Sequence, residues 1–224
     1  MNYSMVTRLI AKDWYLQRWM ILASLAGGAA SLGIVCTGGK AAFMLGLILL
    51  VMVLIFVGAQ LPMAMMVHER KEQTLSFVMS LPISHREYTT AKILGTLLIF
   101  LIPWLVLVLG SLALFAVPNG VALGLLPYTV IMAIEILVGV CLTIAVALVT
   151  ESQGWAVAAV MAGNVGFNIV GYYVAHLPGI AQGMWGSSLM WSPTASTVVL
   201  TEFAVIVLLL CFTFFFQSRK RDFL

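Results

Sequence analysis

Charged side chains are scarce in this sequence. Of its 224 residues only 8% are Asp, Glu, Lys or Arg, whereas 62% are apolar, and the mean hydropathy is +1.11. A soluble globular domain has about 25% charged residues, so the composition excludes an ordinary soluble domain. The net charge of +3 comes from short basic patches beside apolar segments, which gives no sign of nucleic-acid binding. The sequence predicts an all-α polytopic membrane protein with a single transmembrane domain.

Cysteine is also scarce, and its spacing indicates no special chemistry. Cys36, Cys141 and Cys211 are scattered and form no CxxC pair, so neither a disulfide framework nor a zinc site is expected. The methionine-rich run 63–66 could suit Cu(I), because thioethers are soft ligands. Methionine is also an ordinary residue of membrane helices, and we favour packing as its role. No metal site is therefore expected.

The sequence lacks the motifs of a nucleotide-hydrolysing or proteolytic enzyme. A phosphate-binding loop needs Gly, four residues and then Gly-Lys-Ser/Thr, so that backbone N–H groups surround the phosphates. The nearest run, GIVCTGGKA at 33–41, has one residue too many and carries Ala41 in place of the hydroxyl. HERKE at 68–72 lacks the second histidine of a metalloprotease helix. We expect no catalytic residue, no bound cofactor and no enzymatic activity of the chain alone.

Long apolar runs dominate the sequence instead. A helix needs about 20 apolar residues to cross a hydrocarbon core about 30 Å thick. Six runs are long enough, and the membrane helices are expected at 19–37, 41–67, 91–117, 121–150, 155–175 and 196–216. An irregular stretch is expected near Pro127, and the Gly/Pro/Trp-rich segment 176–193 separates the last two helices.

The basic residues indicate which helix ends face the cytoplasm, because short cytoplasmic loops carry an excess of Lys and Arg. Ten of the eleven basic residues lie before the first run, between the second and third runs, or after the sixth. Only Lys40 lies elsewhere. Both basic termini share one side only if the number of crossings is even. Six crossings with both termini in the cytoplasm are therefore expected.

Residues 1–18 are expected to form an amphipathic helix at the membrane interface. They do not resemble a cleaved signal peptide, because Lys12 and Asp13 interrupt them before any apolar core. At about 100° per residue one side of the helix is apolar. That side carries Met5, Val6, Leu9, Ile10 and Leu16. Asp13 lies on it too, so we expect either that its carboxylate pairs with a basic group or a partner, or that the helix ends or bends there.

The run HERKEQTLSFVMSLPISHREY, 68–88, lies between the second and third apolar runs and holds six of the nineteen charged residues. Its first part is compatible with a helix as far as the Leu-Pro pair at 81–82, where proline disfavours further helix. The apolar residues of this part share one face, with Leu75, Val78 and Met79 at helical spacing and Phe77 to the side. A bare connecting loop needs no such face, so we expect a short helix outside the membrane with a docking surface.

The run ERKEQTLSFVMSLPISHREYTTAKIL, 69–94, resembles the segment between the second and third membrane helices of ABC-2 type permeases. In that family the segment has an acidic-basic start, a Thr-Leu pair, a Leu-Pro-Ile-Ser turn and a following Lys. The corresponding residues are Glu69, Arg70, Thr74, Leu75, Leu81, Pro82, Ile83, Ser84 and Lys92. The run LIAKDW, 9–14, looks like the family's opening amphipathic helix.

This resemblance implies a permease subunit of an ABC exporter in a bacterial cytoplasmic membrane, with ATP and Mg²⁺ on a separate ATPase subunit. The loop would form a coupling helix in a groove of that subunit, and a second permease chain, identical or related, would complete the complex. The expected coupling residues are Glu69, Arg70, Glu72, Thr74, Leu75, Phe77, Val78, Leu81, Pro82 and Arg86. The expected secondary contacts are Asp13, Glu151 and Gln153. A peptide, an antibiotic, a lipid-like molecule or a drug would each fit as substrate.

Polar residues inside the apolar runs are candidates for a substrate path. Glu135 lies in the middle of the fourth run, where an acidic residue costs about 2.5 to 3.5 kcal/mol and normally faces protein or water. Asn164, Asn168 and Tyr172 recur every four residues in the fifth run. We expect these side chains either to line the path or to serve packing, with Glu135 as a protonated acid and the asparagines in interhelical hydrogen bonds.

Two further features concern the last two runs. A stripe of small residues, roughly 200° from the asparagines, suits close helix packing. It consists of Gly154, Ala158, Ala162 and Gly166. Glu202 lies near the outer boundary, where we expect it to reach the headgroups or the segment that bears Trp185 and Trp191.

Two other classes of function stay open at this point. A proton-coupled secondary transporter would move its substrate without an ATPase and would depend on Glu135. An intramembrane enzyme would turn over a lipid or a peptide alone, although the sequence offers no set of catalytic residues for it.

Overall fold

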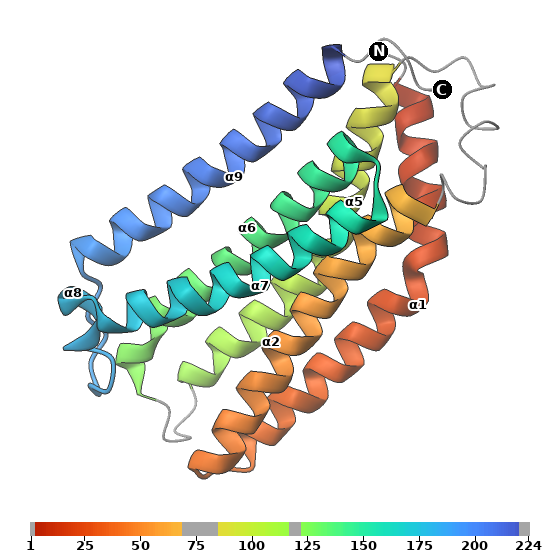
Figure 1. The fold of residues 1–224 in the computed structure, drawn as a ribbon. Coiled ribbons are helices and arrows are strands. Elements are labelled where there is room, and N and C mark those ends of the chain that lie inside the picture. The colour runs from red at the N-terminus through yellow and green to blue at the C-terminus, as the bar shows by residue number, and fades with distance from the viewer. Residues whose placement is uncertain (1–2, 69–84, 117–121, 220–224) are drawn as a thin grey trace.

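The computed structural model describes residues 3–68, 85–116 and 122–219, which form a bundle of long helices (Figure 1). The long helices are α1 (Tyr3–Cys36), α2 (Lys40–Pro62), α5 (His85–Ala113), α6 (Leu126–Thr150), α7 (Gln153–His176) and α9 (Pro193–Arg219). The short ones are the π-helix η1 (Met63–His68), the 3-10 turns η2 (Leu114–Ala116) and η3 (Leu123–Leu125), and α8 (Pro178–Ala181). The described residues include no β-strand.

Six of the helices are long and apolar enough to cross a membrane, judged by length and composition. Their candidate spans are Val6–Cys36, Ala41–Met66, Glu87–Ala116, Leu123–Thr150, Gln153–His176 and Pro193–Gln217. Large apolar side chains face outward from them: Trp19 is 70% exposed and Leu208 is 67% exposed. Lipid tails solvate such side chains, whereas water would not. The prediction of an all-helical protein with six membrane helices is confirmed in the described part of the chain.

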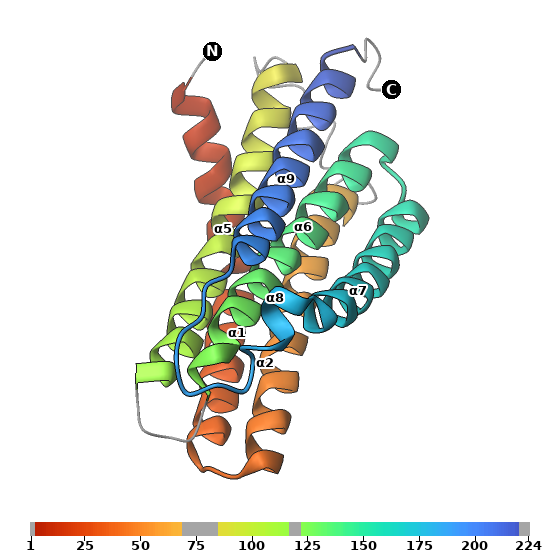
Figure 2. The same cartoon turned by 90° about the vertical axis from the view of Figure 1, so that its left-hand side faces the viewer.

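The long helices run alternately up and down. α1 therefore begins at the same end of the bundle at which α9 finishes (Figures 1 and 2). α5 begins at this end too, and the turn between α6 and α7 lies there. We call it the α1 end. The turn between α1 and α2, α8 and the start of α9 lie at the opposite end, as an even number of crossings requires.

α1 is one continuous helix, with no break between the predicted interfacial part, 1–18, and the first crossing. The sequence from Tyr3 to Leu25 contains neither Pro nor Gly, so nothing interrupts the helix there. At about 1.5 Å per residue its 34 residues extend about 51 Å, well beyond a hydrocarbon core about 30 Å thick. The N-terminal part therefore projects past the core, and its place at the membrane interface stays a prediction.

α5 begins at His85, earlier than the expected third crossing, so residues 85–88 of the predicted loop are helical. The physical reason is a contact with α1. Tyr88 and Ala91 are buried together with Val6 and Leu9 of α1. The apolar face of the first helix thus packs against protein in this region, and it extends α5 by more than a turn.

The main core lies among α1, α2, α5 and α6. Phe100 of α5 is fully buried in it. α2 and α6 approach closely at Gly58, where a Cβ would overlap the side chain of Val140. α5 is tied to α6 by Trp104, whose Nε1–H donates to the carbonyl oxygen of Ala133 at 2.9 Å. Because α7 and α9 also pack on α6, this helix forms the centre of the bundle.

A buried ion pair joins α1 to α5. Lys92 Nζ donates to a carboxylate oxygen of Asp13 at 3.0 Å, and the two side chains are 1% and 3% exposed. Lys12, which is 42% exposed, lies 3.5 Å from the other carboxylate oxygen. Of the two expectations for Asp13, pairing with a basic group is confirmed, and α1 does not end there.

Asp13→Ala should destabilise the protein, because it removes the carboxylate that pairs with the buried Lys92 ammonium. The expected loss is about 3 to 5 kcal/mol in the free energy of unfolding, measured by chemical denaturation in detergent micelles. Lys12→Ala is the control and should cost less than about 1 kcal/mol, because the nearer partner of Asp13 remains. A structural ion pair would be contradicted if both variants unfolded at the same denaturant concentration.

Candidate functional site

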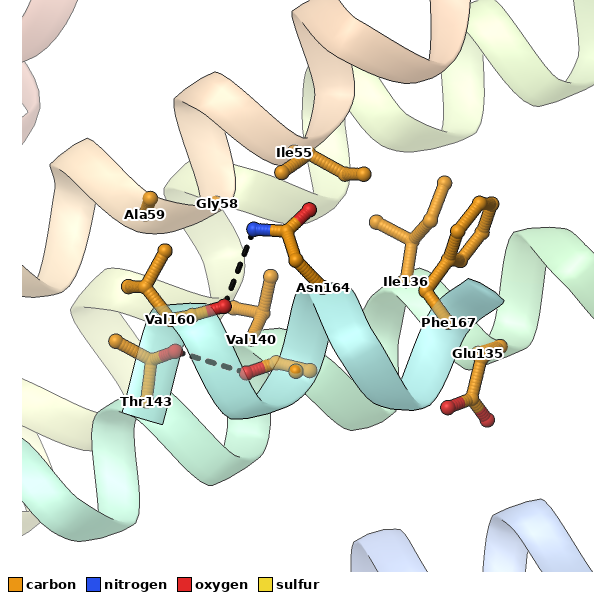
Figure 3. Close-up of a pocket in the computed structure, with 12 residues that line it drawn as sticks. Ile55, Gly58, Ala59, Glu135, Ile136, Val140, Thr143, Val160, Asn164 and Phe167 are labelled. Atoms are coloured by element: carbon orange, nitrogen blue, oxygen red, sulfur yellow. Dashed lines mark hydrogen bonds between the residues drawn. The ribbon is translucent and has the colours of Figure 1, made fainter. Parts of the chain in front are cut away.

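Polar residues of α6 and α7 gather around a narrow cavity inside the bundle (Figure 3). α2, α6 and α7 line it, and its polar side chains are Glu135, Thr143 and Asn164. Its volume is about 30 Å³, which leaves room for about two water molecules at most. In this arrangement of the helices the cavity is too small to hold a transported molecule. We call it the narrow cavity.

The helical period of α6 forms one wall of the narrow cavity. Glu135, Gly139 and Thr143 follow one another at intervals of four residues, and all three line it. α7 approaches this wall at Gly163, where a Cβ would lie 3.4 Å from the Cα of Gly139. The two helix backbones therefore come close together beside the polar side chains.

The four predicted path residues separate into two pairs. Glu135 and Asn164 line the narrow cavity. Asn168 and Tyr172 are exposed on the outer face of α7, Tyr172 by 63%. In Figure 3 the Asn164 side chain points toward α2, whereas the carboxylate of Glu135 points the other way, toward the blue ribbon of α9. The narrow cavity thus brings together two of the four.

The asparagine hydrogen bonds run along α7. Asn164 Nδ2 donates to the carbonyl oxygen of Val160 at 3.1 Å, and Asn168 Nδ2 donates to that of Asn164 at 2.8 Å. Farther along, His176 Nδ1 lies 2.7 Å from the carbonyl oxygen of Tyr172. Within the described residues these bonds stay inside one helix, so the interhelical role expected for the asparagines is not what the structure shows.

Most of the expected stripe of small residues on α7 does not pack against another helix of this chain, although a Cβ at Gly166 would lie 3.9 Å from Oε1 of Glu135 in α6. Gly154, Ala158 and Ala162 are exposed, and Gly166 is half-buried. The contact with α6 uses a second set of small residues on a different face. It includes Ala156, Ala159 and Gly163. The prediction of the packing face is therefore wrong within the single chain, because α7 offers small residues on two faces and periodicity does not choose between them.

A larger cavity of about 440 Å³ lies between α6, α7 and α9. We call it the α9 cavity. Glu135 and Glu202 both line it. Glu202 is only 6% exposed, and neither of its carboxylate oxygens has a hydrogen-bond partner in the described part of the chain. Glu202 thus faces α6 and α7 instead of the headgroups or the tryptophan segment, and no periodicity in the sequence indicates these partner helices.

The segment 176–193 folds over the end of α6. Ile180 and Met184 are buried beside Ile131 of α6. The backbone N–H of Gly124 donates to the carbonyl oxygen of Gly186 at 3.1 Å. Trp185 and Trp191 stay exposed, by 73% and 43%. The segment therefore closes the end of the bundle near the start of α9 and leaves two indole rings on its surface.

Most of the predicted coupling residues lie outside the described part of the chain. They are Glu69, Arg70, Glu72, Thr74, Leu75, Phe77, Val78, Leu81 and Pro82. Arg86 lies in the first turn of α5, but its side chain is not among those described. α5, which follows this part of the sequence, begins at the α1 end of the bundle (Figure 1).

The predicted secondary contacts differ in their surroundings. Glu151 and Gln153 belong to the turn between α6 and α7 at the α1 end, and Gln153 is exposed. Asp13 is buried against Lys92, so its carboxylate offers no surface to a second subunit.

Sequence reasoning missed Gln217 of α9, which is buried and whose Nε2 donates to the carbonyl oxygen of Leu148. A lone glutamine at the end of an apolar run carries no periodicity that would reveal this contact.

Glu151 has a left-handed backbone, with φ 56° and ψ 20°, and it closes α6. Its N–H donates to the carbonyl oxygen of Ala147 at 3.0 Å. Among the described residues other than glycine, no other has a positive φ. A Cβ makes this conformation unfavourable by about 1 to 2 kcal/mol. A strained residue at the point where α6 turns into α7 is a candidate for function, because strain persists where the surroundings require it.

Comparison with known families gives one match. A family model described as an ABC-2 family transporter protein matches residues 8–221. That range contains both cavities, the turn at Glu151 and the segment 69–84. Neither the curated proteins nor the solved structures contain a match to the chain.

Substitution at Glu151 should separate backbone strain from contacts of its side chain. Glu151→Val should lower the free energy of unfolding by about 1 kcal/mol, because a β-branched residue is disfavoured at positive φ beyond the cost that Glu already carries. Glu151→Asn should be close to neutral, since asparagine tolerates this conformation. Denaturation in micelles measures both. If Glu151→Asn were as unstable as Glu151→Val, the side chain and not the backbone would be the cause.

Proposed function

Because the chain belongs to the ABC-2 family of transporter proteins, we propose that it is the membrane subunit of an ABC exporter whose ATPase is a separate polypeptide. The match includes residues 69–94, on which the resemblance rests, so the prediction of the family is confirmed. The family match is the observation that carries the proposal, and six helices able to cross a membrane agree with it. ATP and Mg²⁺ would belong to the ATPase subunit.

The segment 69–84 is the proposed site of coupling to the ATPase. Its apolar residues, Leu75 and Phe77 among them, need to be shielded from water. A groove on the ATPase would shield them by binding the segment as a short amphipathic helix. The elements that flank the segment are well anchored. Met65 of η1 is buried, and its sulfur lies 3.6 Å from the hydroxyl oxygen of Thr96 in α5. A push on the segment would therefore reach α2 and α5 together.

The ion pair would carry the same movement to α1. Lys92 lies about two turns into α5, and its partner Asp13 lies in the part of α1 that projects past the hydrocarbon core. Buried ion pairs need close geometry, so α1 and α5 would move as one body. ATP binding and hydrolysis would favour one arrangement of the helices over the other, because the ATPase contacts the two arrangements differently.

The proposed path runs along α7, where two permease chains would meet. Asn168 and Tyr172 are exposed on its outer face, and an amide in contact with lipid alone would lose hydrogen bonds. A second permease chain, identical or related, would cover this face. The narrow cavity with Glu135 and Asn164 would widen during transport. In this proposal the α1 end faces the cytoplasm of a bacterial cell and the membrane is the cytoplasmic one.

A proton-coupled secondary transporter is the second candidate. The observation that favours it is the presence of Glu135 and Glu202 in one cavity, because carboxylates inside a membrane can carry protons. Such a transporter would work without an ATPase, and Glu135→Gln would abolish its activity.

Co-purification with the ATPase tests the proposed coupling. Leu75→Asp and Phe77→Asp should each abolish the association, because a charge on the apolar face cannot enter the groove without loss of hydration. Leu75→Met is the control and should retain the association. The measurement is the amount of ATPase that an affinity-tagged permease retains after extraction in mild detergent. Undiminished association of both aspartate variants would contradict coupling through this segment.

A further inference from the structure

We propose that the α9 cavity binds the protonated amine of an amphiphilic ligand, between the carboxylates of Glu135 and Glu202. This inference deepens the exporter function proposed above and rests on it, because it gives the class of substrate that this part of the chain would hold. The two carboxylates come from different helices, α6 and α9, and both line the same space of about 440 Å³.

Glu202 is a carboxylate that has no hydrogen-bond partner in the described part of the chain. Only 6% of its surface is exposed, and both oxygens are buried with no hydrogen bond from any described residue. A buried carboxylate of this kind is unfavourable unless a donor or a positive charge reaches it. The residues that line the cavity include neither Lys nor Arg. A molecule that enters the cavity and carries a donor or a positive charge would satisfy both oxygens.

Two threonine hydroxyls of α9 line the cavity together with the carboxylates. Thr197 donates its Oγ1–H to the carbonyl oxygen of Thr194 at 2.8 Å, and Thr201 donates to that of Thr197 at 2.8 Å. With their hydrogens used inside α9, both hydroxyls offer only lone pairs to the cavity. The polar lining, carboxylates and hydroxyls together, consists of acceptors. It is complementary to an ammonium group, which has donors and no acceptor.

The apolar part of the cavity lining suits the body of the ligand. The remaining lining residues are Val138, Val170, Val198 and Val205. Apolar walls around a few polar groups are typical of small-molecule sites, which have volumes of about 300 to 1,000 Å³. A hydrated metal ion or a lone proton would leave these walls without contact. An amine with an aliphatic or aromatic body would fill the space and neutralise the carboxylates at once.

Binding of a matched pair of probes tests the inference. The purified full-length chain in phosphatidylcholine nanodiscs is titrated with a dansyl-labelled primary alkylamine and, in parallel, with its neutral N-acetyl derivative. Fluorescence, corrected with empty nanodiscs, gives each Kd. The protein should bind the amine at least about tenfold more tightly than the acetamide. Glu135→Gln and Glu202→Gln should each remove most of this preference and leave the Kd of the acetamide unchanged.

Glu87→Gln is the matched control, because it removes a carboxylate of α5 at the α1 end, far from the start of α9 (Figure 1). It should keep the preference for the amine. Equal binding of both probes by the unmodified protein would overturn the inference without recourse to any variant. A preference that survives in Glu202→Gln, or that Glu87→Gln reduces as much, would also overturn it.

Association with the ATPase, measured on the same preparations, separates this inference from the proposed function. A chain that binds the ATPase but shows no preference for the amine would overturn the amine site alone. A chain that prefers the amine but binds no ATPase would contradict the exporter and not the site.

Discussion

The hydrocarbon of a bilayer offers no hydrogen bonds, and every polar side chain of the bundle is subject to this constraint. Most hydroxyls meet it inside their own helix, by donation to a carbonyl oxygen three or four residues earlier. Those that do so include Ser24, Ser31, Ser111, Thr143 and Thr213. A carboxylate cannot use this solution, because it has no hydrogen to donate once it is ionised. The buried carboxylates are therefore the positions that need a hydrogen-bond donor or a positive charge from outside their own helix.

Two buried carboxylates illustrate two different outcomes. Asp13 is paired with Lys92, and the pair fixes α1 to α5 near the end at which the chain begins. Glu202 has no such partner among the described residues and faces a cavity that it shares with Glu135. The first arrangement suits a rigid connection, and the second suits a site that is completed by another molecule. In the proposed exporter these become the part that receives force from the ATPase and the part that meets the substrate.

The sequence predicted those features that depend on one helix at a time. Run length located six membrane helices, and the place of Glu135 in the middle of an apolar run marked a side chain that lines the narrow cavity. Features that depend on which helices pack together were harder to predict from the sequence. Periodicity placed Asp13 on the apolar side of its helix but could not name Lys92, and it could not show that Glu202 faces α6. On α7 it selected the wrong small-residue face, because two faces were equally able to pack.

The central claim is that the segment between η1 and α5 is held by a separate ATPase. A photo-reactive amino acid at position 77, with a matched one at Trp185 near the opposite end of the bundle, tests it directly in intact cells. Irradiation followed by mass spectrometry of the adducts should identify an ABC ATPase joined to position 77 and none joined to position 185. An ATPase joined at 185, or a position 77 that never captures one, would contradict the claim.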